Sequence, residues 1–265
     1  MRTVLAALDS SPAARPVLQI ARALGELTGA DVEAVHVADD GAEIPEWLTL
    51  RTRVPLRILA GAVEPNLVRA VADDAVIAAA IGARGTAGGP RPVGHTAMHV
   101  LEHATKPIVV VPPDLVVDGP HAMRTLLVPL EGNIESSQPI LEMLRPLVVA
   151  DVELVVLHVF TKETVPRTLD RPARDLSMWG EEFAARFCPG AHRVELRVGT
   201  VGGEVVTMAG ADAVDLVVLS WARDGSPGHA AVIRDVLGVS TVPVLLLPID
   251  RLAGQERTTT TGHCA

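Results

Sequence analysis

Aromatic residues are scarce in this chain of 265 residues, which contains three Trp, three Phe and no Tyr. Hydrophobic residues still make up 48% and charged residues 21% of the sequence, as in a folded globular protein and unlike a disordered one. Its cores must therefore be packed from Val, Leu, Ile and Ala. Few side chains are left that could stack on nucleic-acid bases.

The chain also lacks a run of basic residues. It has 23 Lys and Arg against 32 Asp and Glu, which gives a formal net charge of −9. Binding to a phosphate backbone needs clustered Lys and Arg, so we expect no nucleic-acid partner. No apolar run reaches the length of a membrane-spanning helix, so we expect no membrane partner either.

Cysteine is nearly absent. The two that occur, Cys188 and Cys264, show no metal-ligand spacing and no disulfide framework, which is typical of a reducing compartment. The apolar run near the start of the sequence, residues 3–8, is too short for a signal peptide. These features predict a cytoplasmic protein with incidental thiols.

What the sequence does contain is an internal repeat. Residues 2–9 (RTVLAALD) reappear as residues 124–131 (RTLLVPLE), and VHV at 35–37 reappears as LHV at 157–159, both at an offset of 122 residues. Two later segments, beginning at residues 56 and 106, reappear at offsets of 138 and 136 residues. A nearly constant register over four segments indicates a duplication.

Each half of the duplication alternates short apolar runs with segments of helical periodicity. Continuously apolar runs are typical of strands that helices cover on both faces, and strands separated by helices pair in parallel through right-handed crossovers. The predicted fold class is therefore α/β, with two tandem doubly wound parallel five-stranded sheets. The runs in the first half are residues 3–8, 31–37, 54–59, 76–81 and 107–111.

Composition places the domain boundaries. We expect a first domain at 1–112, a Pro- and Gly-rich linker at 113–123, a second domain at 124–249 and a disordered tail at 250–265. Below, residues 1–112 are called the first half and residues 124–249 the second half. Pro146 is expected to break or kink the first helix of the second half.

The residues that could bind a ligand or take part in catalysis follow two strands of the first half. Ligands of open parallel sheets bind beyond the carboxyl ends of strands, where the strand order reverses. Asp9 ends the first strand and Gly82 ends the fourth, and Gly85 follows in a glycine-rich loop that leads to a helix start. Such a loop can expose backbone N–H groups to a phosphate, or can be a simple turn.

Several of these residues have a second interpretation. Asp9 could cap the following helix, Gly61 could serve only a turn, and Arg84 could be a solvated charge instead of a phosphate ligand. The three histidines at 95, 99 and 103 form one stripe of a helix, a spacing that can chelate metal. The apolar stripe of that helix lies on its opposite side, so we expect the histidines to face solvent and no metal to bind.

The loop and the repeat together resemble the universal stress protein family. ATP-binding members of that family carry a Gly, two residues, a Gly, nine residues, a Gly and then Ser or Thr. Gly82 and Gly85 match the first pair. Eight residues separate Gly85 from Gly94, which His95 follows; alternatively the nine-residue spacing holds, His95 replaces the glycine and Thr96 keeps the hydroxyl.

The resemblance implies a Rossmann-like, adenine nucleotide alpha-hydrolase-like fold and roles for three further residues. Asp9 resembles the family's acidic residue near the adenosine. Val37 resembles the residue whose backbone meets the adenine edge, and Gly61 resembles the glycine after the third strand.

The second half departs from this pattern. Glu131 replaces the aspartate, and Ser220 and Arg223 replace the two glycines, with Trp221 between them. Side chains at former glycines should block the approach of a phosphate, so no nucleotide is expected there. Because family members pair through their last strands, residues 108–111 and 244–247 could pair within one chain as a pseudo-dimer, with a homodimer of chains as a further option.

The resulting functional hypothesis is a non-catalytic regulator of stress physiology that binds ATP, with or without Mg²⁺, in the first half only and signals to an unknown protein partner. One alternative is a slow ATP hydrolase in which Asp9 or His95 positions water. The other is an interaction scaffold that binds no nucleotide.

Overall fold

The protein is described by a computed structural model, which covers residues 1–11, 14–38, 44, 46–50, 53–84, 92–117, 121–131, 134–144, 152–162, 164, 172–187, 193–211, 213–222 and 227–249. Gly85, Arg223 and both cysteines lie outside these ranges. The expected kink at Pro146 and the expected tail at 250–265 also fall outside them.

Within the described ranges each half contributes five strands, and those of the first half lie within two residues of the predicted runs. The first five are β1 (Thr3–Ala7), β2 (Asp31–Ala38), β3 (Leu56–Ala60), β4 (Val76–Gly82) and β5 (Ile108–Val111). The second five are β6 (Thr125–Pro129), β7 (Glu153–Phe160), β8 (Arg193–Val198), β9 (Leu216–Ala222) and β10 (Val244–Ile249).

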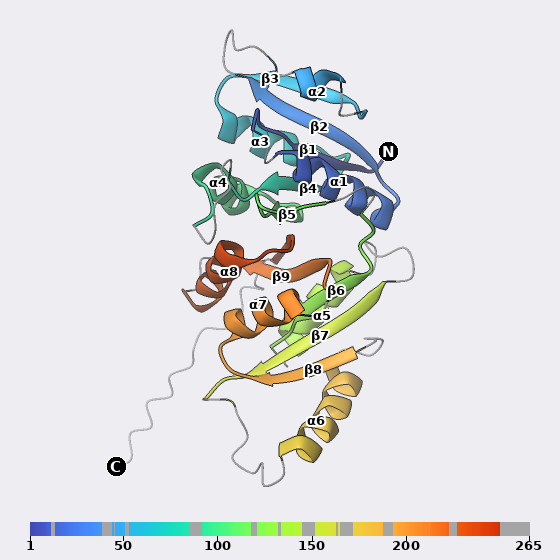
Figure 1. The fold of residues 1–265 in the computed structure, drawn as a ribbon, viewed down its shortest axis with the longest axis vertical. Coiled ribbons are helices and arrows are strands. Elements are labelled where there is room, and N and C mark those ends of the chain that lie inside the picture. The colour runs from blue at the N-terminus through green and yellow to red at the C-terminus, as the bar shows by residue number, and fades with distance from the viewer. Residues whose placement is uncertain are drawn as a thin grey trace, which may run out of the picture.

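These strands form one ten-stranded sheet in the order β3-β2-β1-β4-β5-β10-β9-β6-β7-β8. Pairing within each half is parallel, which confirms the predicted α/β fold. The two five-stranded sheets join through β5 and β10, which pair antiparallel with Val109 opposite Leu245. Pairing of the last strands within one chain is thus confirmed, and it stacks the halves end to end (Figure 1).

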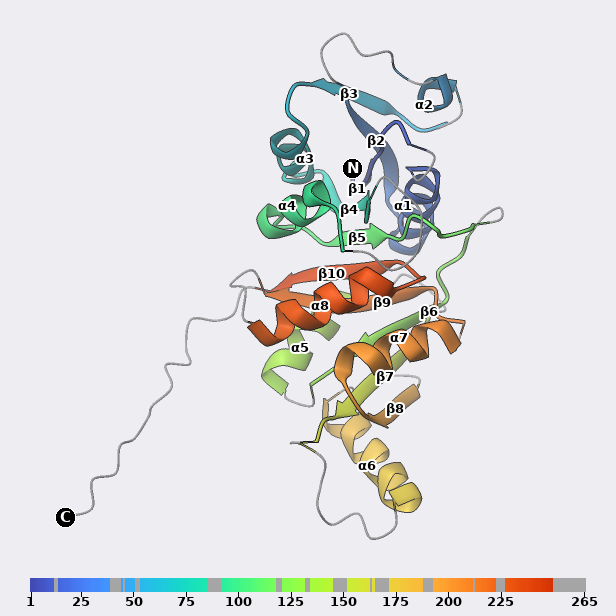
Figure 2. The ribbon, with the colours of Figure 1, turned by 60° about the vertical axis from the view of Figure 1, so that its left-hand side comes forward.

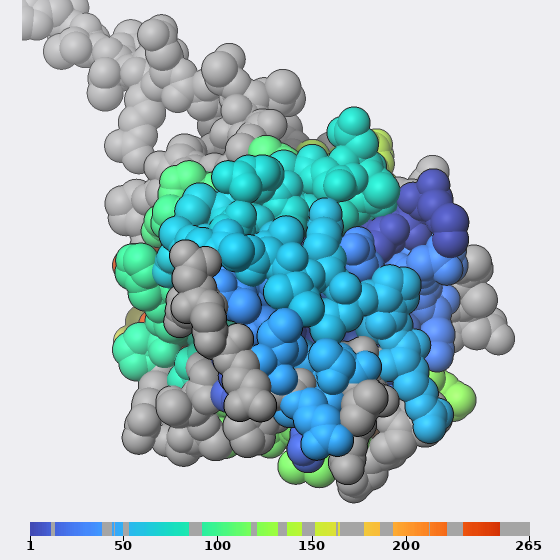
Figure 3. All heavy atoms as spheres, turned by 90° about the horizontal axis from the view of Figure 1, so that it is seen from above, coloured from blue at the N-terminus to red at the C-terminus, as the bar shows by residue number. Residues whose placement is uncertain are grey.

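Helices cover both faces of this sheet. One apolar core lies under α1 (Ala14–Thr28), α2 (Glu46–Leu50), α5 (Ile134–Leu144) and α6 (Pro172–Phe187). The other lies under α3 (Val63–Val71), α4 (His95–His103), α7 (Val201–Ala211) and α8 (Pro227–Val239). Figure 2 shows these helices flanking the sheet, and Figure 3 shows β3 and α3 at the surface of the first-half end.

The apolar periodicity of the sequence decides which side of each helix is buried. In α1, Val17, Ile20 and Leu24 recur at helical spacing and are almost fully buried. In α4, Val100 and Leu101 are buried in the same way. In the described part of the chain, every helix is too short or too polar to span a lipid bilayer.

The duplication extends to details of hydrogen bonding. His36 donates from Nδ1 to the carbonyl of Leu8 at 2.7 Å, and His158 donates in the same way to Leu130 at 2.9 Å. Both pairs are related by the 122-residue offset. A carbonyl can only accept, so each ring carries its proton on Nδ1. In both halves, this contact holds the carboxyl ends of two neighbouring strands together.

Candidate functional site

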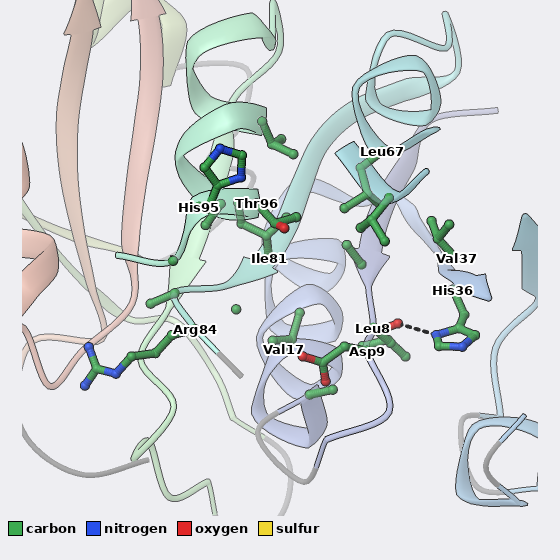
Figure 4. Close-up of a pocket in the computed structure, with 18 of the residues that line it drawn as sticks. Leu8, Asp9, Val17, His36, Val37, Leu67, Ile81, Arg84, His95 and Thr96 are labelled. Carbon is green, nitrogen blue, oxygen red and sulfur yellow. Dashed lines mark hydrogen bonds between the residues drawn. The ribbon is translucent and has the colours of Figure 1, made fainter. Parts of the chain in front are cut away.

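A cavity of about 420 Å³ opens at the carboxyl ends of β1 and β4. The strand order reverses here, because β1 lies between β2 and β4. Residues from α1, α3 and α4 complete its walls, as Figure 4 shows. This is the position at which open parallel sheets bind their ligands, and the volume lies in the range of small-molecule sites.

The walls of the cavity are mostly apolar and its polar side chains are few. Apolar side chains come from three layers, namely the strands and the helices on both faces of the sheet: Val17, Val37, Val63, Leu67, Ile81 and Val100. The polar side chains come from β2, from the loops after β1 and β4 and from the start of α4: Asp9, Ser10, His36, Arg84, His95 and Thr96. An apolar chamber with a few convergent polar groups suits a flat heterocycle that carries polar substituents.

Seven of the nine residues predicted for the site lie around this cavity: Asp9, Val37, Gly82, Arg84, Gly94, His95 and Thr96. Gly85 lies outside the described residues. Gly61 is described but does not line the cavity. Its φ of +102° is a conformation that side chains disfavour, and Asn66 folds back over it to donate to the carbonyl of Ala60 at 3.1 Å. The turn interpretation accounts for Gly61.

Asp9 stabilises the loop after β1. Its Oδ1 accepts a hydrogen bond from the backbone N–H of Ser11 at 2.8 Å, which is a local turn in the chain. The first described residue of α1 is Ala14, so this bond lies in the segment that leads to the helix. In Figure 4 its carboxylate lies beside Val17, at the wall of the cavity.

The backbone of Val37 faces the space beyond β1. Backbone groups of a strand point alternately to either side, and Val35 bonds on the β1 side, where its carbonyl accepts from the N–H of Leu8 at 2.9 Å. Val37, two residues further on, therefore directs its N–H and C=O to that side as well. The ladder of β1 ends at Ala7, so these groups lie at the edge of the cavity.

Gly94 lets the start of α4 approach the end of β4. Its N–H donates to the carbonyl of Ala83 at 2.8 Å, and a Cβ at this position would lie 3.3 Å from that oxygen. Gly94 precedes the first helical residue, His95. The free N–H groups and the positive end of the α4 dipole therefore lie at the rim of the cavity.

Glu64, in the first turn of α3, does not line the cavity itself but contacts two residues that do, and the sequence did not reveal it. Thr96 donates from Oγ1 to its Oε1 at 2.9 Å, and His95 Nδ1 lies 3.5 Å from the same oxygen. A hydrogen bond to its own backbone N–H, together with that of Thr96, holds the pKa of Glu64 below its usual value. One feature of the sequence could have indicated Glu64: α3 follows β3, so the first turn of α3 lies at the same edge of the sheet.

The histidine stripe of α4 lies on the outside. The rings of His99 and His103 stack with centroids 4.2 Å apart, and His103 Nδ1 donates to the carbonyl of His99 at 2.8 Å. The side chain of His95 is 87% exposed. Across the described ranges, no group of three His, Cys, Asp or Glu is arranged to hold a metal ion.

The corresponding strand end of the second half has another role. At the 138-residue offset, Ser220 and Trp221 correspond to Gly82 and Ala83. The indole of Trp221 is buried and donates from Nε1 to the carbonyl of Leu101 at 3.0 Å, which ties the second half to α4 of the first.

The family model of the universal stress proteins matches residues 123–248. The second half of the chain therefore carries the sequence pattern of this family. The match falls on the half whose two glycines are replaced, so it does not depend on the glycine loop.

Solved structures extend the fold of this family to the whole chain. A universal stress protein from Archaeoglobus fulgidus is 17% identical, with a TM-score of 0.64 over 93% of this chain and 98% of its own. A functionally unknown protein from Pseudomonas aeruginosa is 11% identical, with a TM-score of 0.69 over 94% of this chain and 93% of its own. At these identities the likeness concerns the fold alone. Among curated proteins, none matches this chain.

Proposed function

We propose that this chain is a tandem universal stress protein whose first half binds an adenine nucleotide in the cavity between β1 and β4 and acts as a regulator without turning the nucleotide over. The observation that carries the proposal is the cavity itself, which combines the switch-point position, a suitable volume and a convergent set of polar groups.

The adenine ring fits the apolar part of the cavity. Val17, Leu67 and Ile81 offer aliphatic walls on opposite sides. The backbone N–H and C=O of Val37 offer one donor and one acceptor at the edge, which is the pattern that the Watson–Crick edge of adenine complements. Base recognition through backbone groups needs no aromatic residue, in agreement with the scarcity of aromatics in the chain.

The sugar and the phosphates extend toward the rim. The carboxylate of Asp9 can accept from ribose hydroxyls, because only one of its oxygens is needed for the turn with Ser11. The N–H groups at the start of α4 suit a phosphate oxygen. ATP with Mg²⁺ is the ligand that the family resemblance implies, and the restriction to the first half rests on the side chains of Ser220 and Trp221 in the other half.

The regulatory role is supported by the contacts of the polar side chains, which are made within the protein and form no catalytic pair. His36 is bonded to a backbone carbonyl, and Thr96 and His95 are engaged with Glu64, so none of the three is paired with a nucleophile. A bound nucleotide would contact both α3 and α4. It would therefore act on the helix that Trp221 ties to the second half.

Titration calorimetry with Mg-ATP, combined with a phosphate-release assay, tests the proposal. We expect binding near one site per chain with no release above background, and binding weakened about tenfold or more by Asp9→Ala. Phosphate release that Asp9→Ala abolishes would favour the hydrolase. Absence of binding by any adenine ligand would favour the scaffold and contradict the proposal.

A further inference from the structure

The two helices that start at the cavity rim bring their first turns together around one carboxylate. Glu64 belongs to the first turn of α3, and His95 and Thr96 belong to the first turn of α4. Oxygen Oε1 of Glu64 accepts from Thr96 Oγ1 at 2.9 Å and lies 3.5 Å from His95 Nδ1. A side-chain anion therefore already occupies the place where both helix dipoles favour negative charge.

A phosphate group at the start of α4 would compete with this carboxylate. The hydroxyl of Thr96 has one proton to donate, and that proton goes to Glu64. A phosphate oxygen within reach of Thr96 or His95 would also lie close to the Glu64 charge. Only 29% of the Glu64 side chain is exposed, so water screens this charge incompletely.

We propose that Glu64 is a specificity-determining residue that makes the cavity prefer adenosine over ATP, with each phosphate added to the nucleoside weakening binding. This inference rests on the proposed adenine site and specifies which adenine compound the site selects. It assigns to Glu64 the role of an internal substitute for phosphate.

Besides His95, the charged side chains of the described lining are Asp9 and Arg84. Asp9 adds a second carboxylate at the cavity wall. Arg84 is the arginine of the described lining, and in Figure 4 its guanidinium extends away from the side chains of Val17 and Leu67. The repulsion of two carboxylates should increase with the charge of the ligand, in the order adenosine, AMP, ATP.

Glu64→Gln separates the charge of this residue from its hydrogen bonding. The amide keeps an oxygen that can accept from Thr96 and removes the negative charge. Glu102→Gln is the matched control, because it makes the same change in net charge at an exposed residue in the last turn of α4, away from the start of that helix.

The experiment is titration calorimetry of the full chain with adenosine, AMP and ATP in the absence of Mg²⁺. In the wild type we expect adenosine to bind about tenfold or more tightly than ATP. Glu64→Gln should raise the affinity for ATP by about tenfold or more and change that for adenosine by less than about twofold, while Glu102→Gln changes neither by more than about twofold.

Each outcome decides the matter. ATP binding as tight as adenosine binding in the wild type would overturn the inference, and this holds even if Glu64→Gln does not fold. Equal effects of Glu64→Gln on adenosine and ATP would also overturn it and leave the adenine site intact. No binding of any of the three ligands to the wild type would overturn the inference and the proposed function together.

Discussion

The two halves of this chain have the same strand order and the same hydrogen bond between a histidine and a neighbouring strand end, but their fourth strands end differently. In the first half β4 ends in Gly82, at the wall of an open cavity. In the second half β9 carries Ser220 and Trp221, and the indole packs against α4 of the first half. The same position of the fold thus serves a cavity in one copy and an internal interface in the other.

This difference shows how a duplicated fold can divide its tasks. The pairing of β5 with β10 closes an edge that each half would otherwise expose, and Trp221 adds a buried anchor beside it. Once the second copy contributes stability to the whole sheet, its own ligand site can change without loss of the fold.

The largest expected effect comes from removing the anchor. Trp221→Ala should lower the free energy of unfolding by about 3–5 kcal/mol, because it empties a buried volume and leaves the Leu101 carbonyl without its indole donor. Urea denaturation measures the change. Trp179→Ala, at a side chain of the second half that is 43% exposed, should cost about 1 kcal/mol or less. Equal costs would show that Trp221 is not an anchor.

The second prediction sets the two strand ends against each other. Gly82→Leu places a side chain beside Val17 in the cavity and should weaken binding of the adenine ligand by about tenfold or more, or about 1.4 kcal/mol. Ser220→Leu, at the corresponding position of the second half, should leave binding within about twofold. Loss of binding in Ser220→Leu, with binding retained in Gly82→Leu, would contradict the placement of the site in the first half. Calorimetry of both variants measures this.

The third prediction concerns the contact that both halves retain. His36→Phe should lower the free energy of unfolding by about 1–2 kcal/mol, because the buried carbonyl of Leu8 loses its donor. It should also weaken binding of the adenine ligand. His158→Phe should cost less, since Phe160 and Phe183 already pack against that ring and it is only partly buried. His158→Phe should not change the affinity for the adenine ligand. Thermal denaturation and calorimetry of both variants give the answer.

The smallest expected effect is on the pH dependence of stability. The pKa of Glu64 is lowered in the folded chain, so its carboxylate stabilises the fold above the ordinary glutamate value of 4.5 and loses this contribution as pH falls through the lowered pKa. The difference in melting temperature between the wild type and Glu64→Gln should therefore be present at pH 7 and shrink toward pH 3. A difference that grows in acid would contradict the account.

Sequence patterns predicted the fold well because its signals are local or repeated. Continuous apolar runs marked the first five strands, and the repeat placed their counterparts. The short helix α2 was not predicted, since its five residues are too few for a helical period to show. The pairing of β5 with β10 was predicted from the family resemblance and not from the residues alone.

The candidate site was predicted less completely, because some of its contacts join distant segments. Asp9, Gly82 and the start of α4 line the cavity, and the rule on strand ends pointed to them. Glu64 lies 32 residues from Thr96, and Trp221 lies 120 residues from Leu101. No spacing in the sequence indicates such pairs. The replacement of both glycines, with Trp221 between the two positions, suggested only a blocked site and gave no indication of an interface.

The most direct test of the central claim is to locate the ligand on the chain with a photoreactive 8-azidoadenine compound, followed by peptide mapping. The account predicts labelled peptides from the first half, near Val37 or the start of α4, with labelling suppressed by unlabelled adenosine. Labelling of residues 124–249, or of both halves alike, would contradict the claim that only the first half holds the site.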